Sequence, residues 1–329
     1  MSATYLSVED LKVQLRQHLA KDLHAVNCVL ADQLRTSSAF VSDITEHVSH
    51  YRGKQLRPML LLLTHRMIAG GVTRESRMLA AAVEMIHTAT LVHDDVIDKA
   101  ETRRHVATVH RRWNTETSVL LGDYLFSRSF QLAASTGDAE ACRLIGLATN
   151  RTCEGELNQM AARLDDSTPE IDYFRIVRDK TGQLFGLSCL LGCRAAGGSD
   201  VQQRTARRFG LRLGIAFQIA DDVLDLNAPG DVTGKDAGND LQNNRRTLPI
   251  IRAIQLLPEQ DRPRIRQILA EELPGNLAGH PEIQAGIRSA LDTADALTER
   301  AIADLAGFPE CRDRRLLEAI ASFAVSRDA

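Results

Sequence analysis

The chain has 329 residues, of which 44% are hydrophobic, 25% charged and only 4% aromatic. This balance is that of a globular protein and excludes a disordered chain, a collagen-like repeat and a small disulfide scaffold. The formal net charge of −3 also excludes a nucleic-acid binder that depends on bulk positive charge.

Proline is scarce and unevenly placed, which predicts long helices. None occurs between Pro58 and Pro169, a stretch rich in Ala, Leu, Arg and Glu. In the N-terminal part we expect three helices with recognisable boundaries. The first begins after Ser7. The second runs from Met59 to about Ala69 and ends at Gly70-Gly71. The third runs from the N-cap Thr73 to His93.

The second half of the chain continues the helical pattern with one long interruption. Helices are expected at about 117–135 and 139–164, from Pro169 to Gly197-Gly198, and at about 202–226. The segment from Asn227 to Leu248 is rich in Gly, Asn and charge, and loops of this length are usually functional or disordered. Shorter helices should follow from Pro249. With no low-complexity linker, we expect one all-α domain over residues 1–329.

The six cysteines contain no CxxC pair, and no His or Cys group completes a zinc set with Cys189 and Cys193. We therefore expect small buried thiols in a reducing cytosol, and a cytoplasmic protein. Residues 1–10 show no signal peptide. The longest strongly apolar run, Met59 to Leu63, is far too short to span a bilayer.

Two nearly identical acidic segments carry the chemistry: Asp94-Asp95-Val96-Ile97-Asp98 and Asp221-Asp222-Val223-Leu224-Asp225. Residues i and i+4 share a helix face, so like charges stand side by side in each segment. One such cluster is more often a solvated helix end. Two matching clusters favour two helices that face each other across a cavity, with Mg²⁺ bridging their carboxylates to a polyphosphate.

Cationic side chains near both segments suit diphosphate groups. Arg103-Arg104 follows the first segment, Gly234-Lys235 and Arg245-Arg246 follow the second, and Lys54 and Arg57 lie upstream. Arginine forks and lysine point charges are the usual phosphate partners. Each alone is more often a solvated surface residue, but together they indicate more than one anionic group.

With these motifs the chain resembles the all-trans isoprenyl diphosphate synthases, or polyprenyl synthetases, and most of all the long-chain octaprenyl diphosphate synthases. The matching segments follow in family order over nearly the whole chain: Gly53–Pro58, Leu91–Asp98 with Arg103-Arg104, Asp179-Lys180-Thr181, Phe217–Asp225 and Gly234-Lys235. The resemblance implies an antiparallel helical bundle of the isoprenoid synthase type around a central cavity, a homodimer and about three Mg²⁺ ions.

The resemblance also implies roles for single residues. Asp94, Asp98 and Asp221 would bind Mg²⁺ directly, with Asp95, Asp222 and Asp225 as further or supporting ligands. Arg103, Lys180 and Lys235 would hold the allylic diphosphate, and Lys54, Arg57, His87 and Arg104 would hold isopentenyl diphosphate. Thr181 and Gln218 would turn oxygen dipoles toward an allylic cation. Asp94, Asp98, Asp221, Lys180 and Lys235 would be the catalytic residues.

Four positions depart from the family pattern. Gln55 stands in place of an arginine, His105 in place of a glycine and Asp236 in place of a proline, while either Arg245 or Arg246 replaces a lysine. Lys54 and Arg57 remain, so we expect isopentenyl diphosphate to bind. With histidine instead of glycine at position 105, the family pattern gives no expectation for the backbone turn there.

The implied reaction condenses isopentenyl diphosphate onto an allylic diphosphate such as farnesyl diphosphate, and no nucleophilic side chain is required. The growing tail would run from Asp94 along its helix past Thr90, Ala89 and Ile86, toward the N-terminal side. Ala89 and Thr90 are small, so we expect an open tunnel and a product of about C40 by resemblance. Ala89→Phe should shorten it, unless Ala89 merely packs against a neighbouring helix.

Other interpretations remain. The chain could make a shorter C15–C20 product or be a silent partner subunit, although such subunits typically lose aspartates that this chain keeps. A class I terpene cyclase typically has a different second metal motif. A di-iron protein needs two Glu-x-x-His motifs, and only Glu84 to His87 fits.

Overall fold

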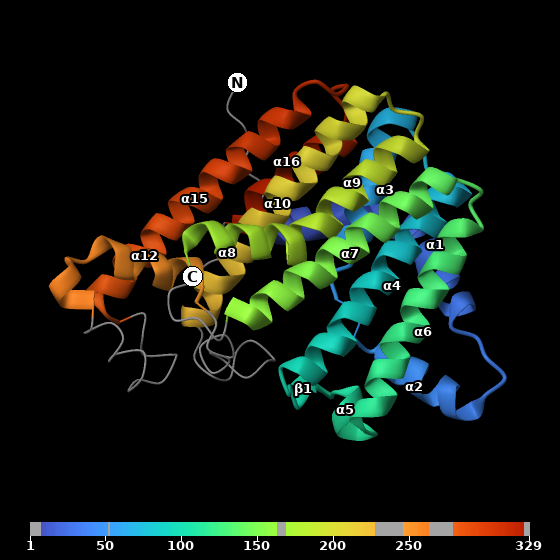
Figure 1. Ribbon diagram of the computed structural model, residues 1–329. Coiled ribbons are helices and arrows are strands. Elements are labelled where there is room, and N and C mark those ends of the chain that lie inside the picture. Colours follow the sequence, from blue (N-terminus) through green and yellow to red (C-terminus); the bar gives the residue numbers. More distant parts are fainter. Residues whose placement is uncertain (1–7, 52, 163–168, 228–245, 263–278, 326–329) are drawn as a thin grey trace.

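The computed structural model describes residues 8–51, 53–162, 169–227, 246–262 and 279–325. These residues are almost entirely helical, apart from one small hairpin (Figure 1). The helices are α1 (Val8–Gln33), α2 (Ala39–Ser49), α3 (Leu56–Ala69), α4 (Arg74–Ile97), α5 (Val109–Arg112), α6 (Thr115–Ala134), α7 (Ala139–Ala162), α8 (Glu170–Val177), the π-helix η1 (Arg178–Gly182), α9 (Gln183–Ala195), α10 (Asp200–Asn227), α12 (Leu248–Leu256), the 3-10 helix η2 (Glu259–Asp261), α15 (Pro281–Leu305) and α16 (Arg312–Val325).

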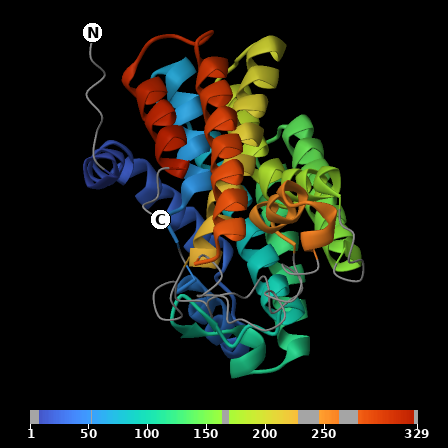
Figure 2. The ribbon, with the colours of Figure 1, turned by 90° about the vertical axis from the view of Figure 1, so that its left-hand side faces the viewer.

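The long helices pack side by side in a bundle. Helix α9 contacts α3 and α10, α10 contacts α15, and α4 contacts α6 (Figure 1). Seen from the side, α15 and α16 lie together, and α16 also packs on α3 (Figure 2). The all-α prediction is therefore confirmed. Among the described residues, none of the helices is both long and apolar enough to cross a membrane.

The apolar run of α3 explains its central place. Leu60–Leu63 are four consecutive leucines, all fully buried in the main core together with Ala80–Val83 of α4 and Phe185 of α9. A helix that is apolar on every side is stable only where neighbours surround it. A second, smaller cluster lies near the C-terminal half of α4. Its buried members are Ile44, Val48, Tyr51, Ala89, Val92, Val109, Leu121 and Leu125.

Two predicted helix boundaries are confirmed. Gly70 adopts φ 71° at the end of α3, and its N–H donates to the Arg66 carbonyl at 2.8 Å. Thr73 caps α4, and it exchanges hydrogen bonds with Ser76 in a capping box. Both boundaries could be predicted from the sequence because a terminal glycine or a capping hydroxyl acts within one helical turn.

Other sequence expectations were wrong or incomplete. Helix α2 and the hairpin were not predicted, and α15, with 25 residues, is not short. Within α15, Gly286 lets α12 pack closely, because a side chain there would collide with the Pro249 carbonyl. The thiols differ as well: Cys189 and Cys193 are buried, whereas Cys28 and Cys153 are exposed.

The hairpin after α4 has an unusual turn. Its strands β1 (Thr102–Arg103) and β2 (Val106–Ala107) pair antiparallel around Arg104 and His105, whose φ angles are 52° and 64°. Two consecutive positive φ values are typical of the type I′ turn, which favours glycine. The Ala107 carbonyl accepts hydrogen bonds from His47 at 2.7 Å and Tyr51 at 3.2 Å. These bonds, from His47 in α2 and from Tyr51 two residues beyond its end, hold the turn in place although glycine is missing.

His105→Gly is therefore expected to stabilise the protein by about 0.5–1 kcal/mol, because glycine removes left-handed strain but adds entropy to the unfolded chain. Urea unfolding would measure this change. His105→Ala is the matched control: it keeps a Cβ and should bring no gain. Equal effects of both variants would contradict a strained turn.

Candidate active site

The two acidic helix ends converge on η1. Lys180 Nζ lies 3.6 Å from Asp94 Oδ2 at the end of α4. The next residue, Thr181, donates a hydrogen bond of 2.9 Å to Gln218 Oε1, one turn before Asp222 on α10. Both residues belong to a π-helical turn, a feature often found at functional sites. Lys180 and Thr181 thus link two motifs that are far apart in the sequence but were expected to face each other.

Helix α7 adds two residues that sequence reasoning missed. Gln159 Oε1 accepts a hydrogen bond of 3.0 Å from Lys180, and Glu156 forms an ion pair with the same ammonium group. Gly155 makes this possible, since a Cβ there would lie only 2.7 Å from the Lys180 backbone nitrogen. The sequence did contain one signal for this contact, a glycine next to a glutamate within a helix. That signal does not show that Lys180 is the partner.

In the first motif, Asp95 differs from its neighbours. Its side chain is 1% exposed, and its Oδ1 accepts bonds of 2.7 Å and 2.6 Å from Arg103 Nε and Nη2. Burial opposes the charged form of Arg103, but the hydrogen bond and charge of Asp95 outweigh it and raise its pKa. Asp94 and Asp98 are partly exposed instead. The motif therefore divides into one buried carboxylate that holds Arg103 and two accessible ones.

The second motif divides in the same way. Asp222 is buried, and it accepts hydrogen bonds from Tyr173 at 2.6 Å and from Gln218 at 2.8 Å. Asp221 and Asp225 are partly exposed. Each of the two helix ends thus has two accessible carboxylates and one buried carboxylate.

These residues fit a hard divalent cation. Carboxylate oxygens come from two helix ends, and the buried Asp95 Oδ2 has no hydrogen-bond partner among the described residues. No group of three acidic, His or Cys side chains within the described residues already forms a metal cage. This open arrangement suits Mg²⁺, which usually keeps waters and binds one or two carboxylates together with substrate phosphates.

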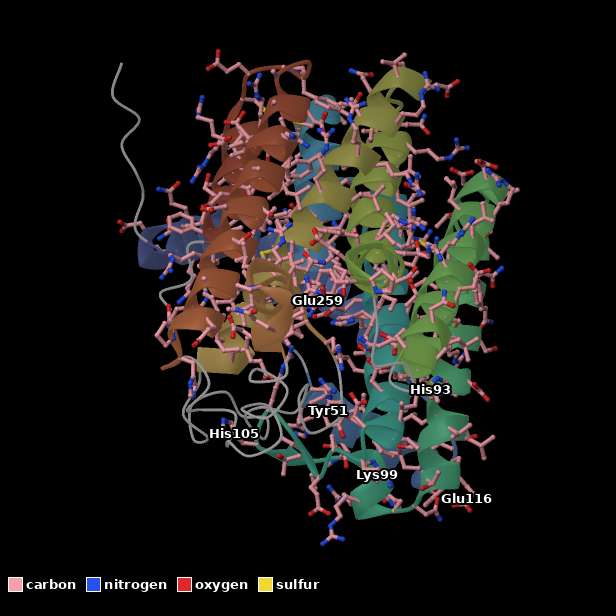
Figure 3. All side chains as sticks on the ribbon, turned by 60° about the vertical axis from the view of Figure 1, so that its left-hand side comes forward. Tyr51, His93, Lys99, His105, Glu116 and Glu259 are labelled. Atoms are coloured by element: carbon pink, nitrogen blue, oxygen red, sulfur yellow. The ribbon has the colours of Figure 1, made fainter. Side chains whose placement is uncertain are left out.

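The cationic loop, residues 53–57 at the start of α3, lies near the hairpin. The Arg104 guanidinium donates to the Tyr51 carbonyl and lies against Gly53, where any side chain would collide with it. Burial lowers the pKa of Arg57 to about 10. The charge of Glu84 raises this pKa, whereas the charge of Arg104 lowers it further. Figure 3 shows Tyr51, Lys99 and His105 at this same end of the bundle. Glu84 is a buried acid within electrostatic reach of Arg57 and Arg104, whereas the sequence drew attention to it only as part of a Glu-x-x-His motif.

The structure explains the departure at Gln55. This residue has φ 52°, and its amide pairs with Asn27 of α1, with Nε2 donating to Asn27 Oδ1 at 2.8 Å. Gln55 therefore ties the cationic loop to α1. Lys54 is exposed, and His87 is partly exposed on α4.

The residues expected to control product length lie on different faces of α4. Thr90 is partly exposed, one turn before Asp94, together with His87 and Leu91. Ala89 is fully buried in the small cluster, and Ile86 is fully buried in the main core. For Ala89 these contacts match the packing alternative that the sequence left open. Thr90 is the one of the three on the accessible face.

Some expected site residues fall outside the described part of the chain. Lys235 and Arg245 are among them, as is Asp236, so their roles stay predictions. Arg246 is described and is partly buried just before α12.

Two hollows lie elsewhere on the described surface. One of about 420 Å³ is bordered by α7, α9 and α10, and one of about 450 Å³ by α8, α12 and α15. Neither is lined by a residue of the motifs. The carboxylates of both motifs, the Lys180 ammonium group and an oriented hydrogen-bond chain meet around η1 instead, and this chemistry marks the candidate site.

The chain is similar over most of its length to known proteins. The family model described as polyprenyl synthetase matches residues 38–277. The all-trans-nonaprenyl-diphosphate synthase (geranyl-diphosphate specific) of Rhodobacter capsulatus is 33% identical over 97% of this chain and 98% of its own length. The octaprenyl diphosphate synthase of Escherichia coli (strain K12) is 31% identical over 96% and 98%. A crystal structure of polyprenyl synthase from Caulobacter crescentus CB15, complexed with calcium and isoprenyl diphosphate, is 33% identical, covers 100% of both chains and has a TM-score of 0.90.

Proposed function

Because the chain belongs to the polyprenyl synthetase family, we propose that it condenses isopentenyl diphosphate onto an allylic diphosphate to make a long-chain all-trans polyprenyl diphosphate of about C40. Long-chain synthases among its relatives support the product class. The observation that carries the proposal is the meeting of both acidic motifs at Lys180 and Thr181. It supports the proposal because cations, carboxylates and a hydroxyl are the groups that suit a departing diphosphate.

In this proposal the accessible carboxylates Asp94, Asp98 and Asp221 hold Mg²⁺, with Asp225 and the Asp95 Oδ2 atom as further oxygens and Asp222 in support. Bound Mg²⁺ would supply charge that stabilises the departing diphosphate. The relative from Caulobacter crescentus, whose structure contains calcium, supports the use of a divalent cation. Mg²⁺ is the choice because it pairs carboxylates with phosphate oxygens.

The chain's own residues bind and orient the substrates. Lys180, Arg103 and Lys235 would hold the allylic diphosphate. Arg103 remains suited to this although Asp95 uses two of its N–H groups, because a guanidinium has five. Lys54, Arg57, Arg104 and His87 would hold isopentenyl diphosphate, and the glycine at position 53 leaves room for the Arg104 guanidinium.

The reaction then breaks one carbon–oxygen bond and forms one carbon–carbon bond. The allylic carbon loses its diphosphate, and the double bond of isopentenyl diphosphate attacks the resulting cation. The departing diphosphate takes the proton that is lost. Oxygen dipoles of Thr181 and Gln218 would face the cation and lower the barrier to ionisation.

The decisive experiment is product analysis of the purified chain alone with Mg²⁺, isopentenyl diphosphate and farnesyl diphosphate. We expect an all-trans polyprenyl diphosphate near C40. A product that stops at C20, or a C15 product when geranyl diphosphate replaces farnesyl diphosphate, would favour the short-chain alternative, and no product from either primer would favour a silent partner subunit. A cyclised hydrocarbon would indicate a terpene cyclase.

Thr90→Phe is expected to shorten the product, because Thr90 lies one turn before Asp94 on the accessible face of α4. Chromatography of dephosphorylated products would show the shift to fewer isoprene units. Thr88→Phe is the matched control, since both threonines bond a carbonyl within the preceding turn of α4, but Thr88 lies on another face. Ala89→Phe, at a fully buried position, should also disturb the small cluster. An unchanged product with Thr90→Phe would contradict this tunnel.

We also propose that the enzyme is a cytoplasmic homodimer, in keeping with its six free cysteines and with apolar side chains exposed on adjacent helices. Leu120 of α6 is 67% exposed and Leu157 of α7 is 65% exposed.

Leu120→Glu combined with Leu157→Glu should shift the protein toward a monomer, as measured by light scattering after gel filtration. Leu256→Glu, at an exposed leucine of α12, is the control that should leave the assembly unchanged. An unaltered mass in the double variant would exclude this interface.

A further inference from the structure

A chain of directed hydrogen bonds runs through the site from a residue that no motif contains. Tyr173 of α8 donates from its hydroxyl to Asp222 Oδ2 at 2.6 Å. Gln218 Nε2 donates to Asp222 Oδ1 at 2.8 Å, and Thr181 Oγ1 donates to Gln218 Oε1 at 2.9 Å. The chain joins α8, α10 and η1, and it ends beside Lys180.

The direction of every bond in this chain follows from one group. An ionised carboxylate only accepts hydrogen bonds, so the Gln218 amide must turn its NH₂ toward Asp222 and its oxygen toward Thr181. Thr181 then has to donate its single hydroxyl proton to that oxygen. The lone pairs of the Thr181 hydroxyl are thereby left for whatever lies on its other side.

Tyr173 holds the Asp222 carboxylate, which sets the direction of the hydrogen bonds in this chain. Its side chain is buried, 5% exposed, and its ring stands edge-on to Phe174 with 5.5 Å between the centroids. By binding Oδ2 it leaves Oδ1 to Gln218, which lies one turn earlier on the same helix. A buried tyrosine hydroxyl normally requires a partner, and here the partner belongs to the second acidic motif.

We propose that Tyr173 is a positioning residue that, through Asp222 and Gln218, orients the Thr181 hydroxyl so that its oxygen faces the carbon that becomes cationic. The inference rests on the proposed function. Such pre-oriented dipoles lower the barrier to charge formation without any cost of reorganisation during the reaction. A threonine turned the other way would present its hydrogen and oppose the cation. Tyr173 therefore acts on ionisation and not on diphosphate binding.

The test compares Tyr173→Phe, Thr181→Val and the double variant. Tyr173→Phe should lower kcat about ten-fold, less than the 10²–10³-fold typical when a directly contacting group is lost, with little change in the KM for farnesyl diphosphate. In the Thr181→Val background the same change should cost nothing more, because the hydroxyl through which Tyr173 acts is gone. The control is Tyr124→Phe, since Tyr124 accepts a bond from Arg128 at 3.1 Å on α6, and it should leave kcat unchanged.

Two further readouts separate this role from a merely structural one. Calorimetric binding of inorganic pyrophosphate with Mg²⁺ should be equal in wild type and Tyr173→Phe. The kcat ratio of variant to wild type should fall further with a 2-fluorinated allylic diphosphate, whose cation is harder to form. Additive losses in the double variant, or pyrophosphate binding that weakens in step with kcat, would overturn the proposal. A wild-type protein without elongation activity would instead refute the proposed function itself.

Discussion

Replacing Asp94 with alanine is expected to lower kcat by about 10²–10³-fold or more while the fold stays intact. Asp94 is an accessible carboxylate at the end of α4, and Lys180 Nζ lies 3.6 Å away. The variant would lose an oxygen that holds Mg²⁺ and also the charge that faces Lys180. It also removes repulsion with Asp98 on the same face, so the free energy of unfolding should hardly change.

Steady-state kinetics and urea unfolding, measured side by side, would check both parts of this prediction. Asp221→Ala should behave in the same way, because Asp221 holds the equivalent position in the second motif. Asp123→Ala is a matched control on α6, where the side chain is 64% exposed. A near-normal rate for Asp94→Ala would remove the basis of the proposed function.

Replacing Asp95 with alanine should cost stability instead, about 3–5 kcal/mol in the free energy of unfolding. Arg103 is 10% exposed and Asp95 is 1% exposed, so the change leaves a buried guanidinium without its carboxylate. Activity should also fall, since Arg103 would no longer be held toward the allylic diphosphate.

The hairpin region offers its own control for this stability effect. Arg111 and Glu101 form an ion pair at 3.5 Å with side chains 63% and 64% exposed. Glu101→Ala should change the free energy of unfolding by less than about 1 kcal/mol, because an exposed pair is solvated and screened. If the two variants lost similar stability in urea, the Asp95–Arg103 pair would not be the buried contact described.

Much of the site was predictable because its motifs are local. Asp94 and Asp98, or Asp221 and Asp225, are four residues apart, so helix geometry alone puts each pair on one face. The same holds for the cap at Thr73. What could not be predicted is which carboxylate of each motif is buried, since that depends on Arg103 and Tyr173 as partners.

Contacts between distant residues account for most of what was missed. Gln55 bonds Asn27, and Lys180 contacts Glu156 and Gln159, across sequence separations that carry no periodic signal. His105 is accommodated because α2 holds the neighbouring strand. Ala89 belongs to the small cluster because α6 packs on that side of α4.

The sequence by itself therefore determined the helical class, the family, the acidic and cationic motifs and the type of reaction they suit. These follow from composition, helical spacing and motif order, which are properties of short stretches of chain. Only the tertiary structure decided that Lys180 and Thr181 join the two motifs, that Tyr173 stands behind Asp222, and that Thr90 rather than Ala89 faces the accessible side. Packing decides such matters, because the burial and the partner of a side chain depend on helices that approach from elsewhere in the chain.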